Sequence, residues 1–310
     1  MTDDYPPLPK LLLSQVAVDR VAHRRSDEEW LSKQWSSPDS RVLVVCSGSV
    51  PVKSARKGNT VELFWRTPAQ APQGERYLLG VAADGCARFA VSVEELPAGE
   101  STGDLRQLAS TLPDSETALL VHAIALDNWH AAHRFCPRCG GPTAVAVAGA
   151  ERRCTLDGSA HFPRTDPAVI VLVTDPAGRA LLGRQSAWPE GRFSTLAGFV
   201  EPGESAEHAV AREIAEESGV IVTDIRYVGS QPWPFPASLM LGFVARAAAQ
   251  EPVPDGVELE QVRWFSRSDI ETAIERGELL APSGISIARR LIERWYGGPL
   301  PEGPSGSTWR

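Results

Sequence analysis

The chain has 310 residues, of which 43% are hydrophobic and 23% are charged, which is typical of a globular protein with two or three domains. Its formal net charge of −8 excludes a broad basic surface for binding long stretches of nucleic acid. The apolar run near the N-terminus covers only Leu11 to Leu13, and no stretch approaches the roughly 18 apolar residues of a membrane helix. We therefore expect a cytoplasmic protein.

The first part of the chain, residues 1–128, predicts an N-terminal α/β domain. Short apolar runs at residues 41–46 and 76–81 alternate with turns rich in Gly, Pro and Ser. Residues 115–134 then repeat apolar side chains near helical spacing, which predicts a helix. No motif in the first hundred residues indicates a function.

The C-terminal half has a different texture and predicts a mixed α+β domain over residues 166–297. The continuous β-branched run at residues 168–174 predicts a strand buried on both faces. Further strands are expected near Val228, Leu241 and Val262, and helices over residues 205–218 and 285–296. The tail, residues 298–310, is rich in Gly, Pro and Ser and is expected to be disordered.

The helix expected after Ser205 carries an acidic cluster. Ser205 is a good N-cap and Gly219 a good C-cap. Glu213 and Glu217 lie four positions apart on one helix face, and Glu216 lies beside them, so the like charges repel. Carboxylate oxygens are the ligands that Mg²⁺ or Mn²⁺ prefers, so the cluster indicates a divalent-cation site. On charge alone, a solvated acidic face explains it equally well.

The segment around this helix resembles the Nudix box, G-x5-E-x7-R-E-U-x-E-E-x-G-U, in which U is a bulky aliphatic residue. Every fixed position matches, namely Gly198, Glu204, Arg212, Glu213, Ile214, Glu216, Glu217, Gly219 and Val220. The resemblance implies a Nudix hydrolase with an α/β/α sandwich around a mixed sheet. It also implies that Glu213, Glu216 and Glu217 hold the metal ions, while Glu204 pairs with Arg212 to brace the preceding loop.

A proline-rich segment, residues 230–238, follows the box. Prolines at alternating positions fix an extended backbone and remove amide donors, so the segment cannot lie in mid-sheet. Trp233 and Phe235 would be held rigidly on a rim, where their rings can stack on a flat heteroaromatic ring. On composition alone, a loop that covers a core is the simpler interpretation.

This segment is similar to the SQPWPFPxS signature of the NADH pyrophosphatase branch of Nudix hydrolases. The resemblance implies hydrolysis of NADH, and of NAD, to AMP and nicotinamide mononucleotide in the matching redox state. It also implies removal of NAD caps from the 5′ ends of RNA. The residues that would line the dinucleotide site are Gln231, Pro232, Trp233, Pro234, Phe235, Pro236, Ala237 and Ser238.

The resemblance carries over to further single positions. Ala197 would offer a backbone carbonyl to the metal and Glu258 an additional carboxylate. The proton of the attacking water would go to Glu217 or Glu258, and the sequence does not choose between them. Phe162 and Phe199 would sandwich the nicotinamide, with one ring supplied by the partner subunit of a homodimer. The remaining positions implied to line the substrate are Ala288 and Arg106.

Three of the five cysteines resemble part of the zinc ribbon that precedes the Nudix domain in this branch, which we place at residues 129–165. Cys136, Cys139 and Cys154 would be ligands, but a zinc site of this kind needs four. The fourth position holds Asp157, which departs from the family's cysteine. Asp157 or the nearby His161 would complete the site. Alternatively, the ribbon has lost its metal and is held by packing alone.

Two other functions remain open at this point. The substrate could be another nucleoside diphosphate derivative, such as ADP-ribose. The chain could instead be a nucleotide-sensing binding module built on a Nudix fold. Such sensors tend to lose the metal carboxylates, and here all of them are present.

Overall fold

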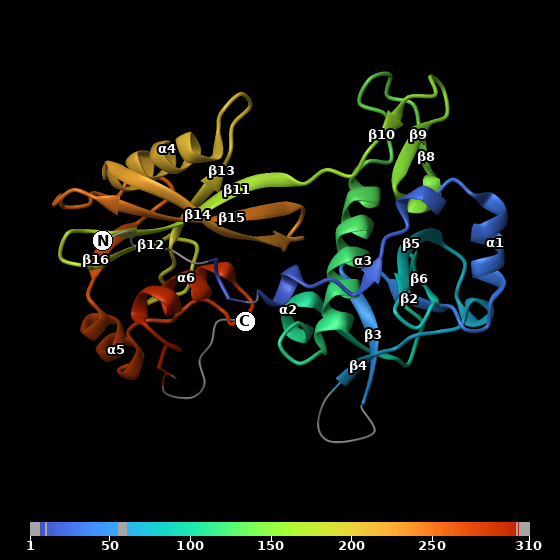
Figure 1. The fold of residues 1–310 in the computed structure, drawn as a ribbon, viewed down its shortest axis with the longest axis horizontal. Coiled ribbons are helices and arrows are strands. Elements are labelled where there is room, and N and C mark those ends of the chain that lie inside the picture. The colour runs from blue at the N-terminus through green and yellow to red at the C-terminus, as the bar shows by residue number, and fades with distance from the viewer. Residues whose placement is uncertain (1–6, 10, 55–60, 302, 304–310) are drawn as a thin grey trace. The chain divides into compact units, whose positions relative to one another are not determined.

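The computed structural model of the protein describes residues 7–9, 11–54, 61–301 and 303 (Figure 1). The chain divides into two compact units. The N-terminal unit comprises residues 12–165 together with the short segment 234–237, and the C-terminal unit comprises residues 1–11, 166–233 and 238–310.

The N-terminal unit contains three small sheets, with strand orders β1-β5-β6-β2, β4-β3-β7 and β10-β9-β8. All strand pairs are antiparallel except β2 with β6. The strands are β1 (Val18–Asp19), β2 (Arg41–Val45), β3 (Ser49–Ser54), β4 (Val61–Leu63), β5 (Glu75–Ala82), β6 (Ala87–Ser92), β7 (Ser101–Asp104), β8 (Thr143–Ala146), β9 (Glu151–Cys154) and β10 (Ala160–His161). The helices are η1 (Leu12–Ser14), η2 (Ala22–Arg24), α1 (Glu28–Ser36), η3 (Pro68–Gln70), α2 (Leu105–Leu108), α3 (Asp114–Ala132) and η4 (Val147–Gly149).

Helix α3 is the longest helix described and confirms the helix predicted over residues 115–134. It begins directly after Pro113 and carries Asp114 and Glu116 in its first turn, where carboxylates interact favourably with the helix dipole. Its buried side chains lie on all sides, which is typical of a helix enclosed by its neighbours. Its buried polar residues include Asp127 and His130, which need partners inside the unit.

His130 is buried in a polar network. Its Nε2 lies 3.0 Å from the Gly149 carbonyl oxygen, and its Nδ1 lies 3.0 Å from Nη1 of Arg152, which also pairs with Glu75. The ring stacks on Tyr77 with a centroid distance of 4.3 Å. Since the guanidinium can only donate, Nδ1 accepts and Nε2–H donates, so the imidazole is neutral. Burial lowers the pKa of His130 to about 4, and the charge of Arg152 acts in the same direction.

The C-terminal unit is built on a six-stranded mixed sheet of order β14-β15-β11-β12-β16, with β13 paired to β11. Strands β11 and β15 are parallel and the other pairs are antiparallel. The strands are β11 (Asp166–Thr174), β12 (Ala180–Arg184), β13 (Leu196–Phe199), β14 (Val222–Trp233), β15 (Ser238–Ala247) and β16 (Gln261–Phe265). The helices are α4 (Ala206–Ser218), α5 (Arg267–Glu275) and α6 (Ile287–Tyr296).

Alternation along β11 divides the C-terminal unit into two cores, one on each face of the sheet. Ile170 and Leu172 point into the core shared with α5 and α6. Val169, Val171 and Val173 point into the core shared with α4. Helices therefore cover both faces of the sheet (Figure 1), and the predicted α+β class and α/β/α sandwich are confirmed.

Several sequence-based expectations concern boundaries. The helices predicted over residues 205–218 and 285–296 and the strand predicted over 168–174 are confirmed, whereas α5 was not predicted. The predicted domain boundaries at residues 128, 165 and 297 stay predictions.

The N-terminal residue Leu8 belongs to the C-terminal unit, and its amide donates to the Val228 carbonyl at 2.7 Å.

The tail also differs from expectation in its first residues. Leu300 is buried in the core beneath α6, so the predicted disorder of residues 298–310 does not extend to it. Residues 302 and 304–310 of that tail lie outside the described residues. Within the described ranges, none of the helices is long and apolar enough to cross a membrane.

The neutral state of His130 predicts a dependence of stability on pH. The folded-state pKa of about 4 lies below the unfolded value of roughly 6.5, so on acidification the unfolded chain binds the proton first. The stabilisation is complete above about pH 6.5 and is lost as the pH falls toward 4. From about pH 7.5 to about pH 5 we expect the free energy of unfolding to fall by about 2 kcal/mol more in the wild type than in His130→Gln.

Urea unfolding at the two pH values measures this difference. The exposed His23 provides the control, and His23→Gln should follow the wild type. An equal loss of stability in the wild type and His130→Gln would show that His130 does not titrate as the network requires.

Candidate functional site

Helix α4 carries the acidic cluster predicted from the sequence. The Ser205 side chain accepts a hydrogen bond from the His208 amide at 3.2 Å, and Gly219 ends the helix in the left-handed region at φ 68°. Both predicted caps are thus confirmed. Ala209, Val210 and Ile214 are buried against the sheet, which fixes the direction in which the glutamates of the last two turns point.

Arg212 braces the loop before α4. Its Nε and Nη2 donate to the two carboxylate oxygens of Glu204, each at 2.9 Å, and Nη2 also donates to the Phe199 carbonyl at 2.9 Å. This bidentate geometry gives the pair its directionality. The predicted pairing of Glu204 with Arg212 is confirmed, and hydrogen bonds from Arg212 lower the pKa of Glu204.

Arg212 also reaches two carboxylates of the acidic cluster. Its Nη1 donates to Glu213 at 2.9 Å and to Glu216 at 3.0 Å. Arg212 therefore offsets part of the repulsion expected between the like charges of these two glutamates and their neighbours. The fourth glutamate of the box, Glu217, receives no hydrogen bond from Arg212.

Glu217 differs from the other glutamates of the cluster in its burial and hydrogen bonding. Its side chain is 3% exposed, and its Oε2 has no hydrogen-bond partner among the described residues. Burial, followed by the charges of Glu213 and Glu258, raises the pKa of Glu217 to about 8. A buried carboxylate surrounded by other carboxylates is stable only when neutral or when paired with a cation. The donor set consists of oxygens, which suits a hard divalent cation.

Glu258 approaches this cluster from a different part of the chain. It lies in the loop between β15 and β16 and is exposed. The Asp255 carboxylate accepts hydrogen bonds from the amides of Val257, Glu258 and Leu259, which fixes the loop at that point. The sequence resemblance had implied Glu258 as an extra ligand, and its charge acts on both Glu213 and Glu217.

The absence of a side chain at Gly198 makes room for the carboxylate of Glu213. A Cβ at position 198 would lie 1.9–2.3 Å from the Glu213 carboxylate atoms, so only glycine leaves room there. Gly198 belongs to β13, where the adjacent Ala197 pairs with Ile170 of β11. The strand thus brings the Ala197–Gly198 backbone under the acidic helix.

The proline-rich segment forms the end of β14, a turn, and the start of β15. Strand β14 lies at the edge of the sheet, as the prolines required. Gln231 is buried, and its side chain donates to the Ile285 carbonyl at 2.8 Å and accepts from the Ile287 amide at 2.7 Å. These bonds tie β14 to the start of α6, beside the buried Ala288.

The turn at residues 234–237 belongs to the N-terminal unit. Asn128 of α3 donates through Nδ2 to the Pro234 carbonyl at 3.0 Å and the Pro236 carbonyl at 3.1 Å. Arg106 of α2 places its guanidinium carbon 3.8 Å from the centroid of the Phe235 ring. The sequence had marked Arg106 but not Asn128, because no local pattern reveals a contact over more than a hundred residues.

The two phenylalanines implied to sandwich nicotinamide are both exposed. Phe199 ends β13 in the C-terminal unit and is 59% exposed. Phe162 follows β10 in the N-terminal unit and is 65% exposed. Exposed aromatic rings of this size are available to a flat ligand or to another protein surface.

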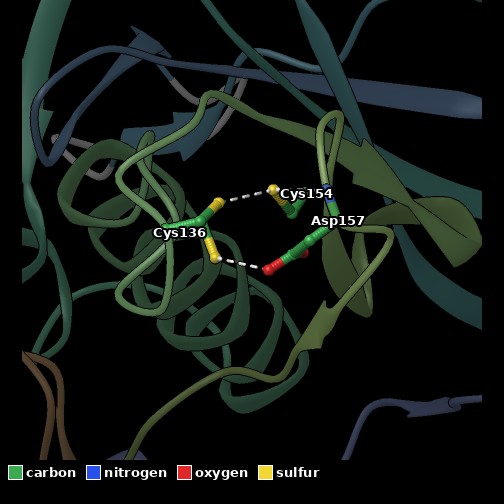
Figure 2. A group of neighbouring side chains, drawn as sticks. Cys136, Cys154 and Asp157 are labelled. Atoms are coloured by element: carbon green, nitrogen blue, oxygen red, sulfur yellow. Dashed lines mark hydrogen bonds between the residues drawn. The ribbon is translucent and has the colours of Figure 1, made fainter.

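The predicted zinc ligands come together in the N-terminal unit (Figure 2). Ligand atoms of Cys136, Cys139, Cys154 and Asp157 all lie within 4.8 Å of one another. The Cys139 and Cys154 sulfurs are 3.4 Å apart, and the Cys136 sulfur is 3.8 Å from Asp157 Oδ2. A tetrahedral zinc with Zn–S bonds of about 2.3 Å has ligand separations of about 3.5–3.8 Å, so the group fits the ion.

Asp157, not His161, completes this group. The Ser159 hydroxyl and amide donate to Asp157 Oδ1 at 2.5 and 2.8 Å and lower the pKa of Asp157, while Asp157 Oδ2 lies toward Cys136. His161 instead lies 3.1 Å from the Ser159 hydroxyl. The amides of Arg138 and Leu156 donate to the Cys136 and Cys154 sulfurs at 3.4 Å, which orients both sulfurs within the group.

Three family models match the chain. The model of the NUDIX domain matches residues 164–282, and that of the NADH pyrophosphatase zinc ribbon domain matches residues 131–162. The model of the NADH pyrophosphatase-like rudimentary NUDIX domain matches residues 39–129, where the sequence offered no recognisable motif.

The chain is also similar to curated proteins over most of its length. The NAD-capped RNA hydrolase NudC of Mycobacterium bovis (strain BCG / Pasteur 1173P2) is 43% identical over 302 residues, which is 92% of this chain and 94% of that protein. The human NAD-capped RNA hydrolase NUDT12 is 41% identical over 196 residues, covering 59% of this chain and 42% of that protein. A NUDIX hydrolase structure from Nitrosomonas europaea is 22% identical, covers 54% of this chain and 95% of its own, and has a TM-score of 0.42.

The contact between Gly198 and Glu213 predicts the effect of Gly198→Ala. The new methyl group must displace the Glu213 carboxylate, which is the mobile end of a long side chain. We therefore expect Mn²⁺ affinity to fall about tenfold or more, while the free energy of unfolding changes by less than about 1 kcal/mol. Titration followed by electron paramagnetic resonance measures the first quantity and urea unfolding the second. Gly284→Ala is the matched control, because its Cβ would meet no atom within 4 Å. Unchanged Mn²⁺ affinity in Gly198→Ala would remove Glu213 from the site.

Proposed function

Because the chain belongs to the Nudix hydrolase family, in its NADH pyrophosphatase branch, we propose that it hydrolyses the diphosphate bond of NADH and NAD. The products are AMP and nicotinamide mononucleotide, reduced when the substrate is NADH. We propose in addition that it removes NAD caps from RNA 5′ ends, as the names of its curated relatives indicate for those proteins. The observation that carries the proposal is the buried Oε2 of Glu217, which has no hydrogen-bond partner among the described residues.

Nudix hydrolases use divalent metal ions, and in this chain we propose Mg²⁺ or Mn²⁺. The residues that would hold the ions are Glu213, Glu216, Glu217, Glu258 and the carbonyl of Ala197. When bound, such ions neutralise the diphosphate, polarise its phosphorus atoms and acidify a water molecule. The oxygen donor set and the raised pKa of Glu217 support this assignment.

The protein's own residues then orient the site and move the proton. Arg212 holds the Glu204 loop and the Glu213 and Glu216 side chains in fixed positions. Either Glu217 or Glu258 accepts the proton of the attacking water. Glu217 is buried, whereas Glu258 is exposed on its loop and can pass the proton on to solvent.

The substrate would bind along the proline-rich segment, residues 231–238. Arg106 packs on the Phe235 ring, which fixes that ring within the segment. The Gln231 side chain is committed to α6, and we propose that it positions the strand next to Ala288. The residues proposed to line the site are Gln231, Pro232, Trp233, Pro234, Phe235, Pro236, Ala237, Ser238, Arg106 and Ala288.

The remaining assignments concern assembly and the ribbon. We propose structural Zn²⁺ on Cys136, Cys139, Cys154 and Asp157, supported by the ligand distances. We also propose a cytoplasmic homodimer in which Phe162 and Phe199 enclose the nicotinamide, with one of the two rings supplied by the partner subunit, supported by the exposure of both rings.

The first experiment is incubation of the protein with NADH and Mg²⁺ or Mn²⁺, with the products resolved by mass spectrometry. We expect AMP and reduced nicotinamide mononucleotide. Glu217→Gln should lower kcat at least about a hundredfold and remain folded, because it removes one metal ligand. Glu207→Gln, an exposed glutamate of the same helix, should keep full activity.

The outcomes separate the alternatives. Intact NADH with both metals, but cleavage of ADP-ribose, would assign another nucleoside diphosphate substrate. Binding of NADH without turnover of any substrate would indicate a sensing module. Cleavage of NAD-capped RNA under the same conditions would extend the activity to RNA ends.

Asn128 offers a second test, since it fixes the turn of the substrate segment. Asn128→Asp keeps the shape of the side chain but removes the two N–H groups that bond to Pro234 and Pro236. We expect KM for NADH to rise about tenfold while kcat changes less than about threefold, because the metal ligands are untouched. Steady-state kinetics measure both. Ser115→Ala, an exposed residue at the start of the same helix, should leave both values unchanged. An unaltered KM in Asn128→Asp would show that this turn does not contribute to binding.

A further inference from the structure

A cavity of about 500 Å³ lies in the C-terminal unit, away from the carboxylate cluster. Its floor includes Leu172 and Val244, which belong to the core shared with α5 and α6. The acidic helix α4 packs against the opposite core, formed around Val169, Val171 and Val173. The cavity and the carboxylates therefore lie on opposite faces of the sheet.

The wall of this cavity is rich in arginine. Three arginines, Arg246, Arg267 and Arg294, line it together with one acidic residue, Asp175. Asp175 is already paired with Arg179, whose Nε lies 2.7 Å from it. The positive charge that faces the cavity is thus not cancelled by the only acidic side chain among its lining residues.

The arginines are held in place by local contacts. The strand register places Arg246 beside the cavity. Arg246 pairs with Thr174 of β11 and lies two residues after Val244, so both side chains are on the same face of β15. Its Nε lies 3.5 Å from Asp224, but that carboxylate is also bound by Arg226 at 2.8 Å. One carboxylate therefore serves two guanidinium groups.

Arg267 and Trp295 contact each other in the wall. Arg267 Nε donates to the Trp295 carbonyl at 3.0 Å, and its guanidinium carbon lies 5.0 Å from the indole centroid. The indole nitrogen donates to the Gly178 carbonyl at 2.8 Å. Within the described ranges no carboxylate forms an ion pair with Arg267, so its two Nη groups remain available for an anion.

We propose that this cavity, the arginine pocket, is a binding site for a small phosphate monoester, such as a nucleoside monophosphate. Guanidinium groups bind phosphate oxygens through paired hydrogen bonds, and three arginines line this cavity. The volume is within the range of small-molecule sites, and Trp295 and Leu172 supply an apolar surface for the rest of the ligand. The site is separate from the proposed diphosphate chemistry and does not depend on it.

Isothermal titration calorimetry with AMP, without added Mg²⁺ or Mn²⁺, tests the proposal. We expect saturable binding that Arg267→Ser weakens about tenfold or more and that Arg267→Lys weakens less, since lysine keeps the charge but not the fork. The control is Arg276→Ser, an exposed arginine at the other end of α5, which should bind like the wild type. NADH hydrolysis by Arg267→Ser should be unchanged.

Further titrations with other ligands and with a second variant identify the chemistry of the ligand and the location of the site. Inorganic phosphate should compete with AMP, and adenosine, which lacks phosphate, should not bind. Glu217→Gln should bind AMP like the wild type, because the pocket lies on the other face of the sheet. Three results would overturn the proposal: no binding of AMP in the millimolar range, equal binding by Arg267→Ser, or loss of binding in Glu217→Gln, which would place AMP at the carboxylates.

Discussion

Glu217 is a carboxylate buried among other carboxylates, and most of the surrounding structure follows from that placement. Burial alone disfavours its charged form, and the charges of Glu213 and Glu258 add to the penalty. Arg212 cannot relieve it, because its donors are taken by Glu204, Glu213, Glu216 and the Phe199 carbonyl. Glu217 is therefore stable when it is neutral or when a cation from outside the polypeptide pairs with it, and an oxygen donor set suits a hard divalent cation.

The same constraint explains why the local sequence is so specific. The Glu213 carboxylate reaches its position only if residue 198 has no side chain, since a Cβ would overlap it. Glu204 must be long enough to take two hydrogen bonds from Arg212, which locks the loop that precedes the helix. A site that keeps its carboxylates fixed before the cation arrives loses little conformational entropy when the cation binds.

Features set by local spacing could be predicted from the sequence, and features set by distant contacts could not. The caps of α4, the shared face of its glutamates and the Glu204–Arg212 pair all follow from residues within one short segment. The edge position of β14 followed from the prolines alone. By contrast, Asn128 meets the Pro234 and Pro236 carbonyls across more than a hundred residues, and nothing near Asn128 in the sequence marks that role. The choice between Asp157 and His161 likewise needed the position of Ser159, which binds Asp157 and faces His161.

Residues of the N-terminal unit hold the turn of the proline-rich segment, a role that their sequence does not suggest. Every carboxylate of the acidic cluster belongs to the C-terminal unit, but the turn at residues 234–237 belongs to the N-terminal unit, where Asn128 and Arg106 hold it. The chain enters that turn from β14 and returns directly into β15, so the two strands and the turn cannot be ordered independently. Because prolines restrict the segment and Asn128 fixes its carbonyls, its conformation is set before a ligand arrives. The conformation of this turn therefore depends on α2 and α3, which lie far from the hydrolase box in the sequence.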